Sequence, residues 1–117
     1  MIVAALGAGC CEVRCLRNEQ HDLLTAVWHD GRMASYHGLR EAHGRFGITL
    51  HRKKSVTYVD AHTGRPFYAG LMAAVMEHLP HNRSNVTGAE LIEVVAIIEA
   101  ANESRANNGA AVRLATA

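Results

Sequence analysis

Residues 22–39, DLLTAVWHDGRMASYHGL, decide the fold, because two strand-like runs flank the pair Asp30-Gly31. An Asp-Gly pair between two such runs is the strongest short-range signal of a β-hairpin. A two-residue turn at this pair would place Val27 opposite Ala34. The sequence therefore predicts two antiparallel strands here, and their register determines which side chains share a face of the sheet.

Further strands are expected on both sides of this hairpin. Residues 11–17, CEVRCLR, alternate apolar and charged side chains with the period of a strand, and residues 44–51 and 55–60 are also strand-like. Short turns between consecutive strands indicate an antiparallel meander. Residues 110–114, AAVRL, suggest a last short edge strand.

Two helices are expected after the meander. The first spans residues 66–79, with Pro66 in a position that suits proline at a helix start. The second follows a capping box, TGAE at 87–90, and has apolar residues at helical spacing. Strands followed by helices indicate the α+β class, here an antiparallel sheet with two helices on one face, in a single domain over residues 1–117.

Such a sheet has one face covered by helices and one open face. With the two-residue turn, the covered core receives Trp28, Met33, Phe46, Ile48 and Leu50. The open face receives Thr25, Val27, His29, Tyr36, Thr49 and His51. A broad, half-apolar open face in a small chain indicates a partner surface, and a homodimer that packs sheet on sheet is the simplest way to cover it.

Composition excludes several function classes. The chain has 117 residues, of which 49% are hydrophobic and 20% charged, with a formal net charge of +1, so a globular protein is expected. This near-neutral charge gives no reason to expect nucleic acid or a membrane surface as partner. Without a recognisable signal peptide, and with the odd number of three cysteines, a cytoplasmic protein without disulfides is expected.

The stretch Gly7-Ala8-Gly9 follows an apolar run, as a dinucleotide-binding loop would. That fingerprint requires a third glycine, where this chain has Glu12, and then a helix, where this chain alternates like a strand. A carboxylate at that position would repel a bound pyrophosphate. No NAD(P) is therefore expected to bind here.

Eight histidines are the unusual feature of the composition. Neutral imidazole is a common ligand of zinc and similar divalent ions, so His29, His51 and His37 are the candidate metal ligands. With the two-residue turn, His29 and His51 share the open face, whereas His37 joins them only if the register slips by one residue. Solvated strand histidines are the alternative.

Four stretches in sequence order carry a resemblance to a known family. They are LGAGCCEV (6–13), AVWHDGRMASYHGLR (26–40), FGITLHRKKSV (46–56) and NVTGAELIEVVAIIEAANESRANNGAAVRL (85–114). The chain resembles the C-terminal domain of the glucose–fructose oxidoreductase / inositol dehydrogenase (Gfo/Idh/MocA) family. That resemblance implies an open sheet that often associates with another copy.

Members of the family pair this domain with an N-terminal Rossmann domain and transfer hydride between a nicotinamide cofactor and a sugar or polyol. Neither the Rossmann domain nor the catalytic helix has a counterpart in this sequence, so no family active-site residue is carried over. RKKS at 52–55 also departs from the acidic-Lys-Gly turn of the family.

The resemblance therefore implies assembly as the leading function, in a non-catalytic oligomerisation or partner module. One alternative is a subunit that completes a dehydrogenase whose Rossmann domain lies on a partner chain. Another is a zinc-type hydrolase of activated esters or phosphoesters, because an open zinc site lowers the pKa of bound water.

Overall fold

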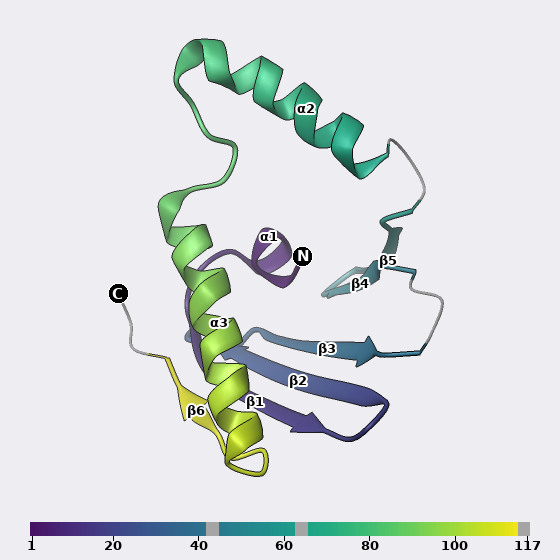
Figure 1. The fold of residues 1–117 in the computed structure, drawn as a ribbon, viewed down its shortest axis with the longest axis vertical. Helices are drawn as coiled ribbons and strands as arrows, with labels where there is room; N and C mark the ends of the chain where they lie inside the picture. Colours follow the sequence, from purple (N-terminus) through teal and green to yellow (C-terminus); the bar gives the residue numbers. More distant parts are fainter. Residues whose placement is uncertain (42–44, 63–65, 115–117) are drawn as a thin grey trace. The chain divides into compact units, whose positions relative to one another are not determined.

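The computed structural model describes residues 1–41, 45–62 and 66–114 (Figure 1). By its contacts the chain divides into two compact units. The first consists of Met1–Ala42 and Thr87–Ala117, and the second of His43–Val86. That residues 1–117 act as one domain stays a prediction.

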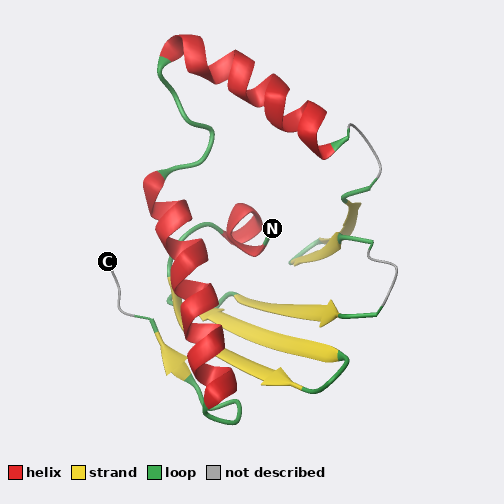
Figure 2. Cartoon of the chain, viewed as in Figure 1, coloured by secondary structure: helices red, strands yellow, loops and turns green. Residues whose placement is uncertain are grey.

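The first unit contains a four-stranded antiparallel sheet in the order β3-β2-β1-β6 (Figure 2). Its strands are β1 (Cys10–Arg17), β2 (His21–Trp28), β3 (Met33–Leu39) and β6 (Val112–Arg113). The helix α3 (Gly88–Ala106) packs against β1, and the short helix α1 (Ile2–Leu6) contacts α3. The predicted α+β class is confirmed.

The second unit contains a hairpin of β4 (Gly47–Arg52) and β5 (Ser55–Asp60), followed by α2 (Phe67–His78) and the 3-10 turn η1 (Leu79–His81). In the described residues β4 pairs only with β5, so the expectation that these strands extend the first sheet is wrong. Alternation shows that a segment is a strand but does not show which strand it pairs with. None of the described residues of this unit is buried.

The core of the first unit lies between α3 and the sheet. Its buried apolar residues are Val3, Cys10, Val13, Cys15, Leu24, Ala26, Trp28, Ile97 and Ala100. Trp28 is buried as expected, and its indole Nε1 donates to the carbonyl of Gly7 at 3.0 Å. This bond satisfies the one polar group of the largest core side chain.

The turn between β2 and β3 has three residues instead of two. Trp28 and Arg32 flank it, with the Trp28 N–H donating to the Arg32 carbonyl at 2.8 Å. Gly31 has a φ of +86°, the left-handed conformation that ends a three-residue hairpin loop. Val27 therefore pairs with Met33, one residue away from the expected partner.

This one-residue slip turns β3 over, because successive side chains of a strand point to opposite faces. Met33 is 71% exposed on the open face, whereas Tyr36 pairs with the buried Leu24 on the helix-covered side. The expected positions of Met33 and Tyr36 are thus wrong. The other misplaced core residues are Phe46, 54% exposed, and the half-buried Ile48 and Leu50, all in the second unit.

Candidate functional site

Two histidines meet on the open face of the first sheet. The rings of His21 on β2 and His37 on β3 stack with centroids 5.2 Å apart and planes 28° from parallel. Nδ1 of His21 lies 3.2 Å from Nε2 of His37. When both rings are neutral, one of these nitrogens carries the hydrogen and donates a hydrogen bond that the other accepts. The pair is the only ring–ring contact in the described part of the first unit.

Strand register and a turn position this pair. His21 is opposite Leu39, and His37 is opposite Leu23, so the two histidines are diagonal neighbours on one face. Long side chains at diagonal positions are within reach of each other. The side-chain oxygen of Asn18 accepts the N–H of His21 at 2.7 Å, which holds the β1–β2 turn just before the pair.

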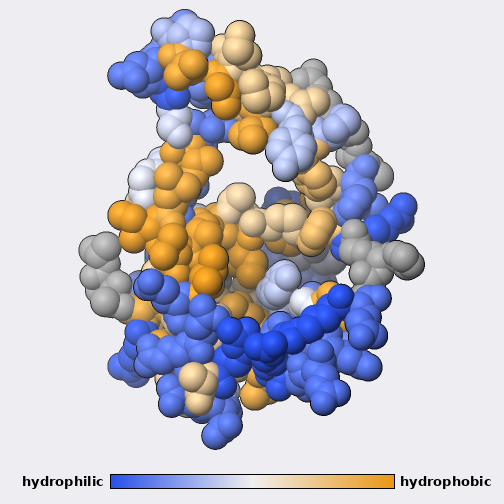
Figure 3. Space-filling view, viewed as in Figure 1, coloured by the Kyte–Doolittle hydropathy of each residue, from blue (hydrophilic) through white to orange (hydrophobic). Residues whose placement is uncertain are grey.

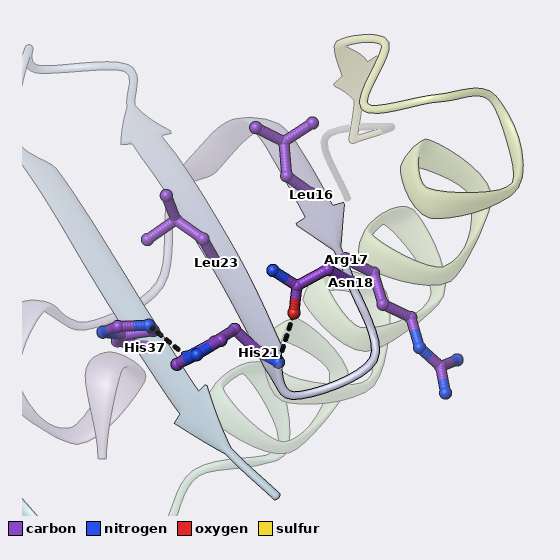
Figure 4. Close-up of a pocket in the computed structure, with 6 residues that line it drawn as sticks. All are labelled: Leu16, Arg17, Asn18, His21, Leu23 and His37. Carbon is purple, nitrogen blue, oxygen red and sulfur yellow. Dashed lines mark hydrogen bonds between the residues drawn. The ribbon is translucent and has the colours of Figure 1, made fainter.

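A hollow of about 440 Å³ lies beside the histidine pair (Figure 4). It is lined by Leu16, Arg17, Asn18, His21, Leu23 and His37. Leu16 and Leu23 pair across β1 and β2 and are 57% and 41% exposed. In Figure 4 the Arg17 side chain points away from the imidazoles. The hollow therefore combines an apolar wall with two imidazoles and has no cation directed at them.

The three histidines expected as metal ligands do not all lie in one place. His37 is on the open face, as a one-residue slip requires, but His29 lies in the β2–β3 turn at the opposite end of β3. His51 lies on β4 in the second unit. In the described ranges, no three His, Cys, Asp or Glu side chains are grouped to hold a metal. A site of His29, His37 and His51 stays a prediction.

Sequence reasoning missed His21, which begins its strand and carries no spacing motif. The signal that would have found it is the turn. A three-residue loop ending at Gly31 places His21, Leu23 and His37 on the same face, whereas the two-residue loop places His37 opposite Leu24 on the other.

A carboxylate on α3 accepts hydrogen bonds from the backbone at the end of the glycine stretch, residues 7–9. Oε1 of Glu93 accepts the backbone N–H of Gly9 at 2.9 Å and also that of Cys10. Consecutive backbone N–H groups of this kind are the donors that a phosphate takes in a dinucleotide loop. In this structure their anion is Glu93, which gives the glycine stretch a role in joining α3 to β1.

The thiols of Cys10 and Cys15 lie in the core, as small buried residues do. Burial raises the pKa of the Cys10 thiol, and the carboxylate of Glu93 adds to the effect. Burial also raises the pKa of Cys15, with Asp22 contributing. A raised pKa favours the thiol over the thiolate, which is the nucleophilic and metal-binding form. These positions support a packing role.

An ionic cluster near the start of β2 joins three parts of the first unit. Oδ2 of Asp22 accepts a hydrogen bond from Arg40, just after β3, and Oδ1 lies 3.8 Å from Nη1 of Arg105 on α3. The hydrogen bond from Arg40 holds the pKa of Asp22 below its ordinary value, and the charges of Arg40, Arg17 and Arg105 add to this. The cluster connects α3 and the residue after β3 to β2.

Comparisons of the chain with protein-family models, curated proteins and solved structures found no match. Of the helices that the structure describes, none has the length and apolar character needed to cross a membrane.

Proposed function

We propose that this chain is an assembly module that forms a homodimer by packing the open faces of two four-stranded sheets. The open face consists of Glu12, Arg14, Leu16, His21, Leu23, Thr25, Val27, Met33, Ser35, His37, Leu39 and Arg113. Four large apolar side chains on this one face are exposed: Leu16, Leu23, Met33 and Leu39, at 57%, 41%, 71% and 50%. That exposure is the observation that carries the proposal.

Physical chemistry favours a second sheet as the cover. Apolar area is worth about 25 cal/mol per Å² when it leaves water, and two sheets bring such faces together about 10 Å apart. Two charged residues of the face are matched to each other, because Nε of Arg14 lies 3.2 Å from Oε1 of Glu12, and Arg113 lies opposite Glu12 on the same face. The free-energy cost of burying an ion pair in an interface is lower than that of burying a single charge without a partner. A two-fold axis through the face lets each copy supply the same surface.

The proposal extends the resemblance to the C-terminal domain of the Gfo/Idh/MocA family, whose sheets associate. In this proposal the module works in the cytoplasm and contributes assembly to a partner that carries a Rossmann domain. Exposed apolar side chains along α3 offer that partner a separate surface (Figure 3). They include Leu91, Ile92 and Val95, which are 57%, 63% and 54% exposed.

Sedimentation equilibrium of the purified chain tests the dimer. The wild type is expected to be a dimer, and Met33→Glu a monomer, because the new carboxylate would be covered without a partner. Met76→Glu is the matched control, since Met76 is 67% exposed on α2, in the second unit. Circular dichroism establishes that each variant folds.

A monomeric wild type would overturn the proposal. So would a dimer that survives Met33→Glu but is lost in Met76→Glu, because the interface would then involve α2.

A further inference from the structure

We propose that His21 and His37 bind a zinc-class divalent ion and that two copies of the chain share this ion, each providing both imidazoles. The inference rests on the proposed dimer and assigns it a chemistry. Both side chains belong to the open face that the dimer would cover.

The distance between the two nitrogens carries the first step. Zinc binds histidine nitrogen at about 2.0–2.1 Å, so two ligands of one tetrahedral ion lie roughly 3.3 Å apart. Nδ1 of His21 and Nε2 of His37 are 3.2 Å apart, a separation that matches two ligands of one tetrahedral ion. The rings are stacked 28° from parallel, so they would rotate to aim both lone pairs at an ion that replaces the hydrogen-bonding proton.

Exposure and charge carry the second step. His21 is half-buried and His37 is exposed, so an ion reaches both nitrogens from the open face. The nearest lining cation, Arg17, points away from them (Figure 4). Arg14, also on this face, is paired with Glu12. The bound ion would thus meet little repulsion from the chain that holds it.

The number of ligands carries the third step. Structural zinc sites have four protein ligands, and the described residues place no third His, Cys, Asp or Glu beside these two. If a two-fold axis passes through the ion, the second copy supplies two more imidazoles. The ion then has four ligands, so the site is complete only in the dimer. Metal binding and dimerisation would then stabilise each other, because an ion that binds only the dimer shifts the equilibrium toward it.

Zinc titration by calorimetry, run beside sedimentation with zinc or with EDTA, tests the inference on the whole chain. One zinc ion per two chains is expected, with tighter dimerisation when zinc is present. His21→Gln and His37→Gln should each weaken binding by more than the roughly 10–100-fold that loss of an outer partner costs a metal site. Cobalt(II) in place of zinc should give the strong visible absorption of a tetrahedral site.

His29→Gln and His51→Gln are the matched controls, because they remove an imidazole from the β2–β3 turn and from β4. Both are expected to bind zinc like the wild type. If either abolished binding while His21→Gln did not, the assignment of ligands would be wrong. Circular dichroism separates a lost ligand from a lost fold.

The remaining outcomes separate this inference from the proposed dimer. One zinc ion on each monomeric chain would overturn the shared site. A dimer in EDTA that takes up no zinc would overturn the metal site and leave the dimer intact. A chain that is monomeric with and without zinc would overturn both.

Discussion

The buried hydroxyl of Ser104 on α3 accepts the backbone N–H of Cys15 at 2.9 Å and donates to the carbonyl of Ala110 at 2.6 Å. Strand β6 pairs with β1 only at Glu12 and Val13. If that pairing continued, Ala110 would be opposite Cys15. The hydroxyl takes the place of this missing pair, so one side chain completes the edge of the sheet and attaches the helix to it.

Ser104→Ala is expected to destabilise the fold by about 1–3 kcal/mol, because it leaves a buried N–H and a carbonyl without their partner. Urea unfolding followed by circular dichroism measures the change. Ser55→Ala removes an exposed hydroxyl from the start of β5 and should change stability by less than about 0.5 kcal/mol. Equal effects of the two substitutions would show that the Ser104 bridge contributes nothing.

Glu93→Ala is expected to cost about 1.5–3 kcal/mol, the range for hydrogen bonds to a charged group, since two backbone donors lose their acceptor. Amide hydrogen exchange should locate the loss, with faster exchange at Gly9 and Cys10. Glu99→Ala on the same helix is the control, because Glu99 is exposed. Unchanged exchange at Gly9 in Glu93→Ala would contradict the assignment.

Acid should weaken the fold through Asp22. Because Arg40 holds its pKa below the ordinary 3.8, folding favours the charged carboxylate. The resulting stabilisation is complete above that ordinary value and is lost as the pH falls through the lowered pKa. Urea midpoints measured from pH 7 down to pH 2 should therefore fall at the acid end, and the fall should be smaller in Asp22→Asn.

Part of the acid sensitivity should remain in Asp22→Asn, because two other carboxyl groups also have lowered pKa values. The backbone N–H of Arg32 lowers the pKa of Asp30, and that of Thr87 lowers the pKa of Glu90. An unchanged pH profile in Asp22→Asn would show that the Arg40 pair does not contribute to stability.

Gly31→Ala is expected to destabilise the hairpin by about 1–2 kcal/mol, the cost of a left-handed residue with a Cβ. No atom lies within 4 Å of the added carbon, so the cost comes from the backbone alone. Gly70→Ala, within α2 and also in open space, should instead stabilise its helix by about 0.5–1 kcal/mol. In thermal unfolding, Gly31→Ala should lower the melting temperature and Gly70→Ala should raise it. An unchanged melting temperature in Gly31→Ala would contradict the turn geometry.

Local interactions made several elements predictable from sequence. The capping box at the start of α3 forms as expected, with the Thr87 side chain accepting the N–H of Glu90 at 3.2 Å and the Glu90 carboxylate accepting that of Thr87 at 2.8 Å. Strand β5 has the expected bounds, and Trp28 is buried as expected. Each of these features depends on neighbours within a few residues or on the period of a strand.

The candidate site was only half predictable. The residue type of His37 predicts a metal ligand, but the face on which it lies depends on whether the turn before it has two residues or three. The same Asp30-Gly31 pair suits both turns. The three-residue turn puts His37 on the same face as His21. The opposite face of β2, which carries the buried Leu24 and Trp28, is the covered one.

The sequence by itself determined the α+β class, the two longer helices and the strand character of each segment, because these depend on interactions between residues close in the chain. Only the tertiary structure decided the register between β2 and β3, that β4 and β5 form a sheet of their own, and that His21 meets His37. It also decided that Glu93 binds Gly9 and that Ser104 binds Cys15, across separations of 84 and 89 residues. Such contacts depend on how helices and sheets pack, and short-range sequence patterns do not contain that information.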